Sequence, residues 1–200
     1  MTVTSVRKVS AEHYSVTVDG EEIASTLGAI TDMRIFAEKE ISGEQLTEFK
    51  LLSARYLALE KAVEILSRRQ MSSGELKKKL SEKKFEEDIC EYCSAWAQRN
   101  GFIDDARYAE VVVKHYSQKG FGPAKIKAEL SKRLVNREFW EDALNSQEPD
   151  TSVIDRLVSS KIKDPDDKNQ IMKVSAFLQR RGFTWEEIKE AIERNRYLQD

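Results

Sequence analysis

The sequence predicts a mainly α-helical protein built of three tandem three-helix repeats, elongated and curved, behind a small N-terminal antiparallel β segment. The first observation is a hydrophobic signature that recurs three times with the same i, i+4, i+9 spacing. Its copies are Leu76, Leu80 and Phe85, then Ile126, Leu130 and Val135, then Val174, Leu178 and Phe183. They are offset by 50 and then 48 residues, and periods of roughly 20–50 residues mark repeat architectures. The second observation is an N-terminal region with strand-like alternation instead of this signature.

The N-terminal region, residues 1–42, is predicted to form the β segment. Apolar and polar residues alternate from Tyr14 to Val18, and Asp19-Gly20 follows directly, which is typical of a strand entering a tight turn. The stretches Val3–Val9 and Ile23–Leu27 supply the neighbouring strands. We therefore expect a small antiparallel sheet.

A long helix is predicted to follow. Ser42 and Gln45 have the Ser-x-x-Gln spacing of a capping box, in which two side chains satisfy free backbone groups at a helix start. The helical pattern then continues without Gly or Pro until Gly74, and its length predicts a bend or break near Ser53. This leading helix and the first repeat together occupy residues 43–103.

Each repeat is predicted to contain three amphipathic helices, with the second repeat at 104–147 and the third at 148–200. Apolar residues at i, i+3, i+4 and i+7 mark the first helices. In the first two repeats these residues are Leu59, Ala62, Val63 and Leu66, and Ala109, Val112, Val113 and Tyr116. The third repeat is less regular: its first helix has Val153, Ile154, Leu157, Val158 and Ile162, but Ser160 and Lys161 occupy positions that are apolar in the earlier copies. Capping boxes at Ser72-x-x-Glu75 and Thr184-x-x-Glu187, and Pro123 after Gly122, predict three further helix starts.

Local charge is more informative than net charge. The chain has 33 basic and 35 acidic residues, so the net charge of −2 indicates no partner. From Arg68 to Lys84, however, seven basic residues face two acidic ones, and from Lys119 to Arg137 six face one. With Leu76 and Leu80 turned inward, the lysines between them must lie on the solvent side of the helix. Stacked repeats would join the two faces into one basic stripe suited to an acidic protein groove or a phosphate backbone.

The candidate partner-binding or DNA-binding residues come from these two basic segments. They are Arg68, Arg69, Lys77, Lys78, Lys79, Lys83, Lys84, Phe121, Lys125, Lys127, Lys132 and Arg133. Two plainer interpretations stay open: the lysines form an ordinary solvated face, and Arg68 and Arg69 stabilise a helix C-terminus. Phe121 is included because it lies between two glycines in a turn, where an aromatic ring can be exposed. Core packing is the better account of most other aromatic residues in the repeats, and Trp96, Phe102 and Trp185 are assigned to the core on this ground.

No catalytic, metal or cofactor site is expected. Asp104 and Asp105 fit a helix cap and first turn better than acid–base chemistry. Cys90 and Cys93 have Cys-x-x-Cys spacing, but no histidine stands in ligand spacing with them, so they are interpreted as structural thiols. No Gly-x-x-x-x-Gly-Lys phosphate-binding loop is present.

The sequence predicts a cytoplasmic protein without a membrane anchor, and a monomer is the expectation although no residue pattern specifies the oligomeric state. No run approaches the roughly 18 apolar residues that a spanning helix needs, and the N-terminus lacks the pattern of a signal peptide. Two cysteines in 200 residues cannot make a disulfide framework, which agrees with a reducing compartment.

Three further stretches are informative: Arg68–Leu76, Gly101–Ala109, and Gly122 followed by Ile126 and Leu130. They resemble the RecX family, the proteins that bind and restrain the RecA recombinase. The resemblance implies a negative regulator that lies as a curved wedge in the deep groove of the RecA–DNA filament and limits its growth, ATPase and strand exchange. It also implies a place in DNA repair and the SOS response.

Two other functions remain open from the residues alone. Three-helix units resemble helix-turn-helix folds, so a module acting directly on single-stranded or double-stranded DNA is the main alternative. A helical adaptor for some other protein is the second.

Overall fold

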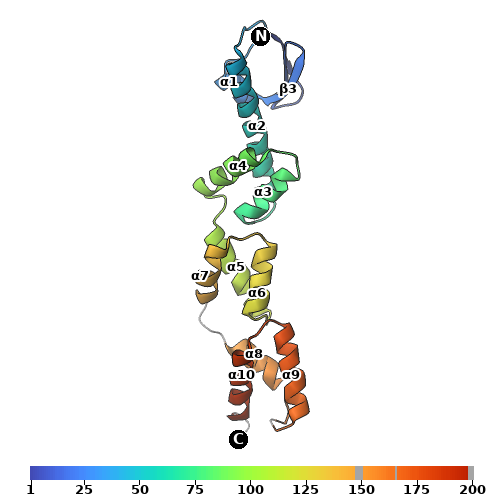
Figure 1. Cartoon of the computed structure of the whole chain (residues 1–200), viewed down its shortest axis with the longest axis vertical. Helices are drawn as coiled ribbons and strands as arrows, with labels where there is room; N and C mark the ends of the chain where they lie inside the picture. Colours follow the sequence, from blue (N-terminus) through green and yellow to red (C-terminus); the bar gives the residue numbers. More distant parts are fainter. Residues whose placement is uncertain (147–150, 165, 198–200) are drawn as a thin grey trace. The chain divides into compact units, whose positions relative to one another are not determined.

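The structure is a computed structural model that describes residues 1–146, 151–164 and 166–197 (Figure 1). The chain divides into two compact units, Met1–Ile103 and Asp104–Asp200, each described by itself below. The boundary expected at 147/148 lies outside the described residues. No described helix combines the length and apolar character that crossing a membrane requires.

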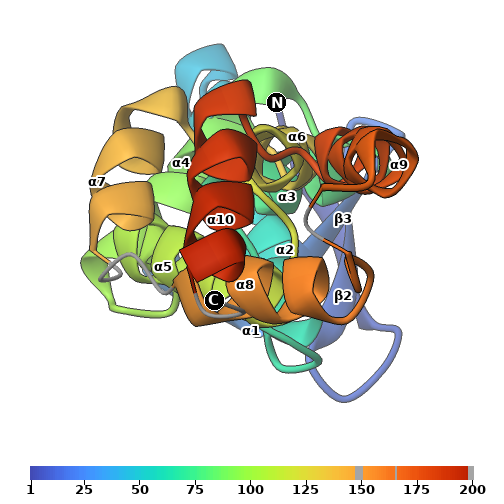
Figure 2. The same ribbon diagram turned by 90° about the horizontal axis from the view of Figure 1, so that it is seen from below.

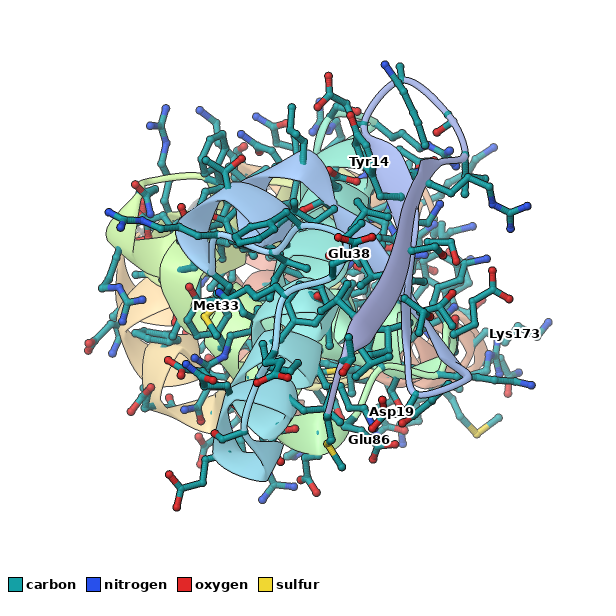
Figure 3. The ribbon with its side chains drawn as sticks, turned by 90° about the horizontal axis from the view of Figure 1, so that it is seen from above. Tyr14, Asp19, Met33, Glu38, Glu86 and Lys173 are labelled. Atoms are coloured by element: carbon teal, nitrogen blue, oxygen red, sulfur yellow. The ribbon has the colours of Figure 1, made fainter. Side chains whose placement is uncertain are left out.

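The N-terminal β segment is a three-stranded antiparallel sheet, as predicted. Its strands β1 (Val3–Lys8), β2 (His13–Val18) and β3 (Glu21–Thr26) are neighbours in chain order. Asp19 and Gly20 join β2 to β3 with φ angles of 46° and 88°, the left-handed backbone that a two-residue hairpin turn requires. Figure 3 shows Tyr14 and Asp19 toward opposite ends of β2.

A short helix, α1 (Leu27–Asp32), follows the sheet, and it begins at Leu27, which the sequence had assigned to the end of the third strand. Thr26 ends β3 and caps α1, because its hydroxyl oxygen accepts a 3.4 Å hydrogen bond from the Ala29 N–H. Ala29 and Ile30 are buried in the same core as the sheet. The alternating pattern could not reveal this switch, because the cap depends on one side-chain contact.

The leading helix α2 (Gly43–Leu66) starts at the predicted capping box, but the break expected near Ser53 is wrong. Ser53 is 1% exposed, and its hydroxyl lies 2.8 Å from the hydroxyl of Ser25 on β3. A serine with such a partner need not compete for the helix backbone, and without Gly or Pro nothing interrupts the hydrogen-bond ladder.

Helix α2 serves two cores, which explains why its apolar pattern changes midway. Its first half packs Phe49 against the sheet, and its second half packs Ala58 and Ala62 into the first repeat. Figure 1 shows α2 leading from the sheet to α3 and α4. Val63, expected on the buried stripe, is 43% exposed, because the buried face is centred on Ala58 and Ala62.

The three tandem repeats are confirmed by three separate hydrophobic cores. The first repeat combines the end of α2 with α3 (Ser73–Ser81) and α4 (Glu87–Arg99). The second contains α5 (Asp105–Gln118), α6 (Pro123–Lys132), the 3₁₀ turn Arg137–Phe139 and α7 (Trp140–Asn145). The third contains α8 (Thr151–Ser159), α9 (Lys168–Arg180) and α10 (Trp185–Tyr197). Figure 2 shows α9 nearly end-on, with α8 and α10 lying across the view.

The first two residues of the recurring signature lie on the inward face of the second helix of each repeat. The third residue follows the end of that helix and packs on the same core. Leu76, Leu80, Ile126, Leu130, Val135, Val174 and Leu178 are buried, while Phe85 and Phe183 are partly buried against the same cores. This periodic burial fixes which side of α3, α6 and α9 remains available to solvent.

The second and third repeats meet where α9 ends and α6 begins. The Gly122 N–H donates to the Arg181 carbonyl at 2.9 Å, and the Ala124 N–H donates to the Gly182 carbonyl at 3.1 Å. The Arg181 side chain also donates to the carbonyls of Lys119 and Gly120. Backbone groups that each helix end leaves free are thus satisfied by the neighbouring repeat.

Candidate partner-binding surface

The α3 face is the first of the two predicted basic surfaces and comprises Lys77, Lys78, Lys79, Lys83 and Lys84. Leu76 and Leu80 are fully buried, so the lysines around them are directed away from the core. Lys78, Lys83 and Lys84 are exposed, while Lys77 and Lys79 are half-buried. The Ser72 hydroxyl accepts a 3.0 Å hydrogen bond from the Glu75 N–H and starts this helix where predicted.

The α6 face is the equivalent surface of the second repeat and comprises Lys125, Lys127, Lys132 and Arg133. Ile126 and Leu130 are buried and orient it in the same way. Lys125 and Lys132 are exposed, and Lys127 is half-buried. The two faces belong to different compact units.

One lysine of each face is neutralised within its own repeat. Lys77 on α3 donates to Glu91 on α4 at 2.6 Å, and Lys127 on α6 donates to Glu141 on α7 at 2.7 Å. Both pairs span 14 residues and join the second helix to the third. Because the same ion pair occurs in both repeats, it indicates a structural role for Lys77 and Lys127. The sequence alone did not distinguish this role from contact with a partner.

The two candidate arginines of the first repeat also have internal partners. Arg68 forms an ion pair with Glu64 one turn earlier in α2. Arg69 donates to both carboxylate oxygens of Glu75, which joins the end of α2 to the start of α3. Because α2 ends at Leu66, both arginines lie beyond its last turn, and these contacts are ion pairs instead of the expected stabilisation of a helix end. Their binding to a partner stays a prediction.

The remaining lysines carry the uncompensated charge. Over the described ranges, no ion pair or side-chain hydrogen bond involves Lys78 and Lys79 on α3, Lys83 and Lys84 in the turn after it, or Lys132 on α6. The Lys125 ammonium is 3.9 Å from the carboxylate of Glu129, a long separation for an ion pair. Fewer lysines are therefore free of internal contacts than the sequence suggested, and Lys78, Lys83, Lys84 and Lys132 are the exposed ones among them.

Two candidates of the second repeat differ from expectation. Arg133 is half-buried, because its guanidinium donates to the Tyr108 hydroxyl at 3.1 Å and lies over the Tyr116 ring. Phe121 is partly buried rather than exposed, because its ring packs on the second core, 5.7 Å from Tyr116 and 5.2 Å from the Arg181 guanidinium. Both residues contribute to packing within Asp104–Asp200, and their contact with a partner stays a prediction.

The second helix of each repeat, α3, α6 or α9, is followed by a residue with left-handed backbone, and in the first repeat this residue is Lys84. Lys84, Leu134 and Gly182 hold equivalent positions, with φ angles of 66°, 54° and 88°. A left-handed residue after the helix closes its last turn, and glycine adopts that conformation most easily. Only the third repeat uses glycine, so in the first two repeats a long side chain projects from this turn.

Two exposed aromatic residues were missed by the sequence analysis. Phe102 is 54% exposed and stacks on Trp96, and Trp185 at the start of α10 is also largely exposed. Both were assigned to the core because they lie beside apolar residues. No periodicity covers them, since each lies in or next to a turn between helices.

The acidic and thiol groups have structural surroundings. The Asp104 carboxylate accepts a 2.9 Å hydrogen bond from the Arg107 N–H and caps α5. Cys90 and Cys93 are buried free thiols, and burial raises the pKa of both, that of Cys93 to about 11. Among the described residues, no three His, Cys, Asp or Glu side chains gather in a group that could hold a metal ion.

Three family models match the three repeats in order. They describe the first, second and third three-helix domains of RecX and match residues 58–93, 104–144 and 153–192. A protein of Vibrio parahaemolyticus named Regulatory protein RecX is 32% identical over 137 residues, which cover 66% of this chain and 88% of the relative. A protein of Shigella boydii with the same name is 31% identical over 145 residues, 66% and 87% of the two chains.

Two solved structures share the fold. A crystal structure of regulatory protein RecX superposes with a TM-score of 0.73 at 18% identity and covers 96% of this chain and 98% of its own. The crystal structure of RecX from Lactobacillus salivarius gives 0.67 at 22% identity, covering 72% and 97%. The first comparison extends over the N-terminal sheet as well as the repeats.

Proposed function

The chain belongs to the RecX family, and we propose that it regulates a RecA-type recombinase by binding the recombinase–DNA filament through the α3 and α6 faces. One observation carries this proposal: equivalent helices of two successive repeats present lysines without an internal partner. The complete proposal is that the chain is a cytoplasmic monomer, occupies the groove of the filament, and limits filament growth, ATP hydrolysis and strand exchange. It acts by binding, without a catalytic site or cofactor of its own.

The repetition of the basic face suits a repetitive partner. A filament offers the same acidic and phosphate groups at regular intervals, so a chain with tandem basic helices can form several weak contacts at once. Linked weak contacts raise the overall affinity far above that of one contact. Clustered lysines also attract an anionic surface from a distance and speed association at low salt.

The test replaces only the exposed lysines without internal partners. A variant with Lys78→Glu, Lys83→Glu, Lys84→Glu and Lys132→Glu should lose most of its inhibition of the recombinase's DNA-dependent ATPase. The control carries the same change of charge at four exposed lysines elsewhere: Lys8→Glu, Lys114→Glu, Lys163→Glu and Lys173→Glu. Helical circular dichroism checks that both variants remain folded.

The control should inhibit nearly as well as the unaltered chain. If the two variants lose inhibition equally, net charge rather than these faces determines binding. If the first variant inhibits fully, the docking surface lies elsewhere. In either case the assignment of the α3 and α6 faces is wrong.

A further inference from the structure

The end of α4 presents a stacked aromatic pair to solvent. The ring centroids of Trp96 and Phe102 are 5.2 Å apart, and the ring planes differ by 16°. Trp96 is half-buried and packs against the first-repeat core, so it supports the outer ring from below. Phe102 is 54% exposed, which leaves much of its ring uncovered. A flat aromatic surface held from beneath is suited to stacking another flat ring.

The backbone fixes this ring in place. Gly101, with φ of 72°, closes α4, and the Phe102 N–H donates to the Ala97 carbonyl at 2.9 Å. The next residue, Ile103, turns into the core and is buried. Phe102 is thereby directed outward and onto Trp96. Its exposure is a consequence of the turn and not of a loose chain end.

A tyrosine and two arginines lie on the elements next to the pair. Tyr92 lies one turn before Trp96 on the same side of α4, and the Arg55 guanidinium of α2 lies 4.6 Å from the Tyr92 ring centroid. Arg99 is exposed in the last turn of α4. From Tyr92 to Ile103 the sequence contains no Asp or Glu, and the nearest acidic residues along the chain are Glu91 and Asp104.

We propose that this aromatic face, defined by Tyr92, Trp96 and Phe102 with Arg55 and Arg99, binds single-stranded nucleic acid by stacking an unpaired base on Phe102. Base–aromatic stacking tolerates any sequence because every base has a π-face, and nearby arginines attract the phosphates. An apolar protein segment would gain little from two guanidinium groups, whereas a nucleotide offers both a flat ring and an anion. This face is separate from the α3 and α6 faces and does not depend on them.

The experiment measures binding without the recombinase. Fluorescence anisotropy of a labelled oligothymidine is compared with that of an abasic strand of the same length and phosphate number, at one fixed salt concentration. Phe102→Ala should weaken binding of oligothymidine by roughly 5- to 150-fold, the range expected for loss of one stacked base. Binding of the abasic strand should not change, because it has no base to stack.

Phe36→Ala is the matched control. Phe36 is 59% exposed in the same compact unit and has Lys39 5.8 Å from its ring centroid, but no described aromatic ring stacks on it. This variant should bind both strands as the unaltered chain does. Arg99→Ala should weaken both strands alike and flatten the salt dependence, because it removes a phosphate contact.

Three results would overturn the proposal. The unaltered chain could fail to bind oligothymidine, Phe102→Ala could equal Phe36→Ala, or Phe102→Ala could weaken the two strands equally. Loss of recombinase inhibition in Phe102→Ala with unchanged oligothymidine binding would likewise assign this face to a protein partner. None of these outcomes concerns the lysines of α3 and α6, so the two proposals fail separately.

Discussion

Gly122 and Gly182 pack at the same backbone junction, and neither position has space for a side chain. A Cβ on Gly122 would lie 2.4 Å from the Gly182 carbonyl oxygen, and a Cβ on Gly182 would lie 2.4 Å from the Lys125 backbone nitrogen. Both obstacles are backbone atoms, which cannot rotate away. The start of α6 and the end of α9 therefore form one backbone-to-backbone junction between the second and third repeats.

Gly122→Ala should loosen this junction. We expect a loss of about 1–3 kcal/mol, typical of inserting a methyl group where no space exists. Hydrogen–deuterium exchange should report it locally, as faster exchange at Ala124, whose N–H donates across the junction. Gly43→Ala is the control, because nothing lies within 4 Å of its Cβ position and an exposed change there should stay within about 0.5 kcal/mol. Equal exchange at Ala124 in both variants would show that the junction is not tight.

Lys77 and Lys78 are neighbours with different expected roles. Lys77 is paired with Glu91, whereas Lys78 is exposed and has no ion pair within the described part of the chain. Lys78→Met should therefore weaken binding to recombinase filaments clearly more than Lys77→Met. Lys77→Met should instead cost up to about 1 kcal/mol of stability, the usual range of an exposed ion pair. Co-sedimentation with filaments and urea unfolding measure the two effects, and a reversed order would contradict the assignment.

Arg133 and Lys132 offer the same comparison in the second repeat. Arg133 is packed against Tyr108 and Tyr116, so Arg133→Ala should destabilise Asp104–Asp200 by about 1–3 kcal/mol. Lys132→Ala should leave stability within about 0.5 kcal/mol and reduce filament binding. Thermal unfolding alongside a filament-binding titration distinguishes them. If Arg133→Ala left stability unchanged, the inward role of this side chain would be wrong.

The two cysteines should be unreactive in the folded chain. Burial raises the pKa of Cys90 and Cys93, so at pH 8 both remain protonated, and the thiolate is the form that reacts with iodoacetamide. Mass spectrometry should find neither thiol alkylated in the native chain and both alkylated in urea. Rapid native labelling at pH 8 would contradict their burial.

The same pKa shift predicts a loss of stability in alkaline solution. Cys93 ionises near its ordinary value of 9 when unfolded, but only at about 11 when folded. Between these values the unfolded chain releases a proton that the folded chain keeps, so stability falls as the pH rises from 9 to 11. A Cys93→Ala variant should show a smaller fall over this window in urea unfolding. An equal fall would place the alkaline effect in another group.

The repeat architecture was predictable because it depends on local periodicity. Leu76, Ile126 and Val174 lie at equivalent positions of their own helices, and burial of such positions follows from the helical period alone. Residues whose roles depend on contacts distant in sequence were not predictable. The Ser53 hydroxyl pairs with the hydroxyl of Ser25 on the sheet, and α2 continues through this position. The ring of Phe121 is partly covered by the guanidinium of Arg181 from the next repeat.

The candidate site was predictable only as a set of charges. The spacing placed Lys77 and Lys127 on the solvent side of their helices, but their pairing with Glu91 and Glu141 needs the third helix of each repeat in place. The exposure of Phe102 depends on a turn at Gly101 that no periodic pattern includes. A sequence pattern thus locates a charged face, and packing decides which of its members remain available.

Electron microscopy of the chain bound to RecA filaments on single-stranded DNA tests the proposed function most directly. We expect density for the chain along the filament groove, with α3 and α6 facing the recombinase and DNA, and loss of that density in the four-lysine variant. Density in which these two helices face solvent, or equal occupancy by the variant, would contradict it.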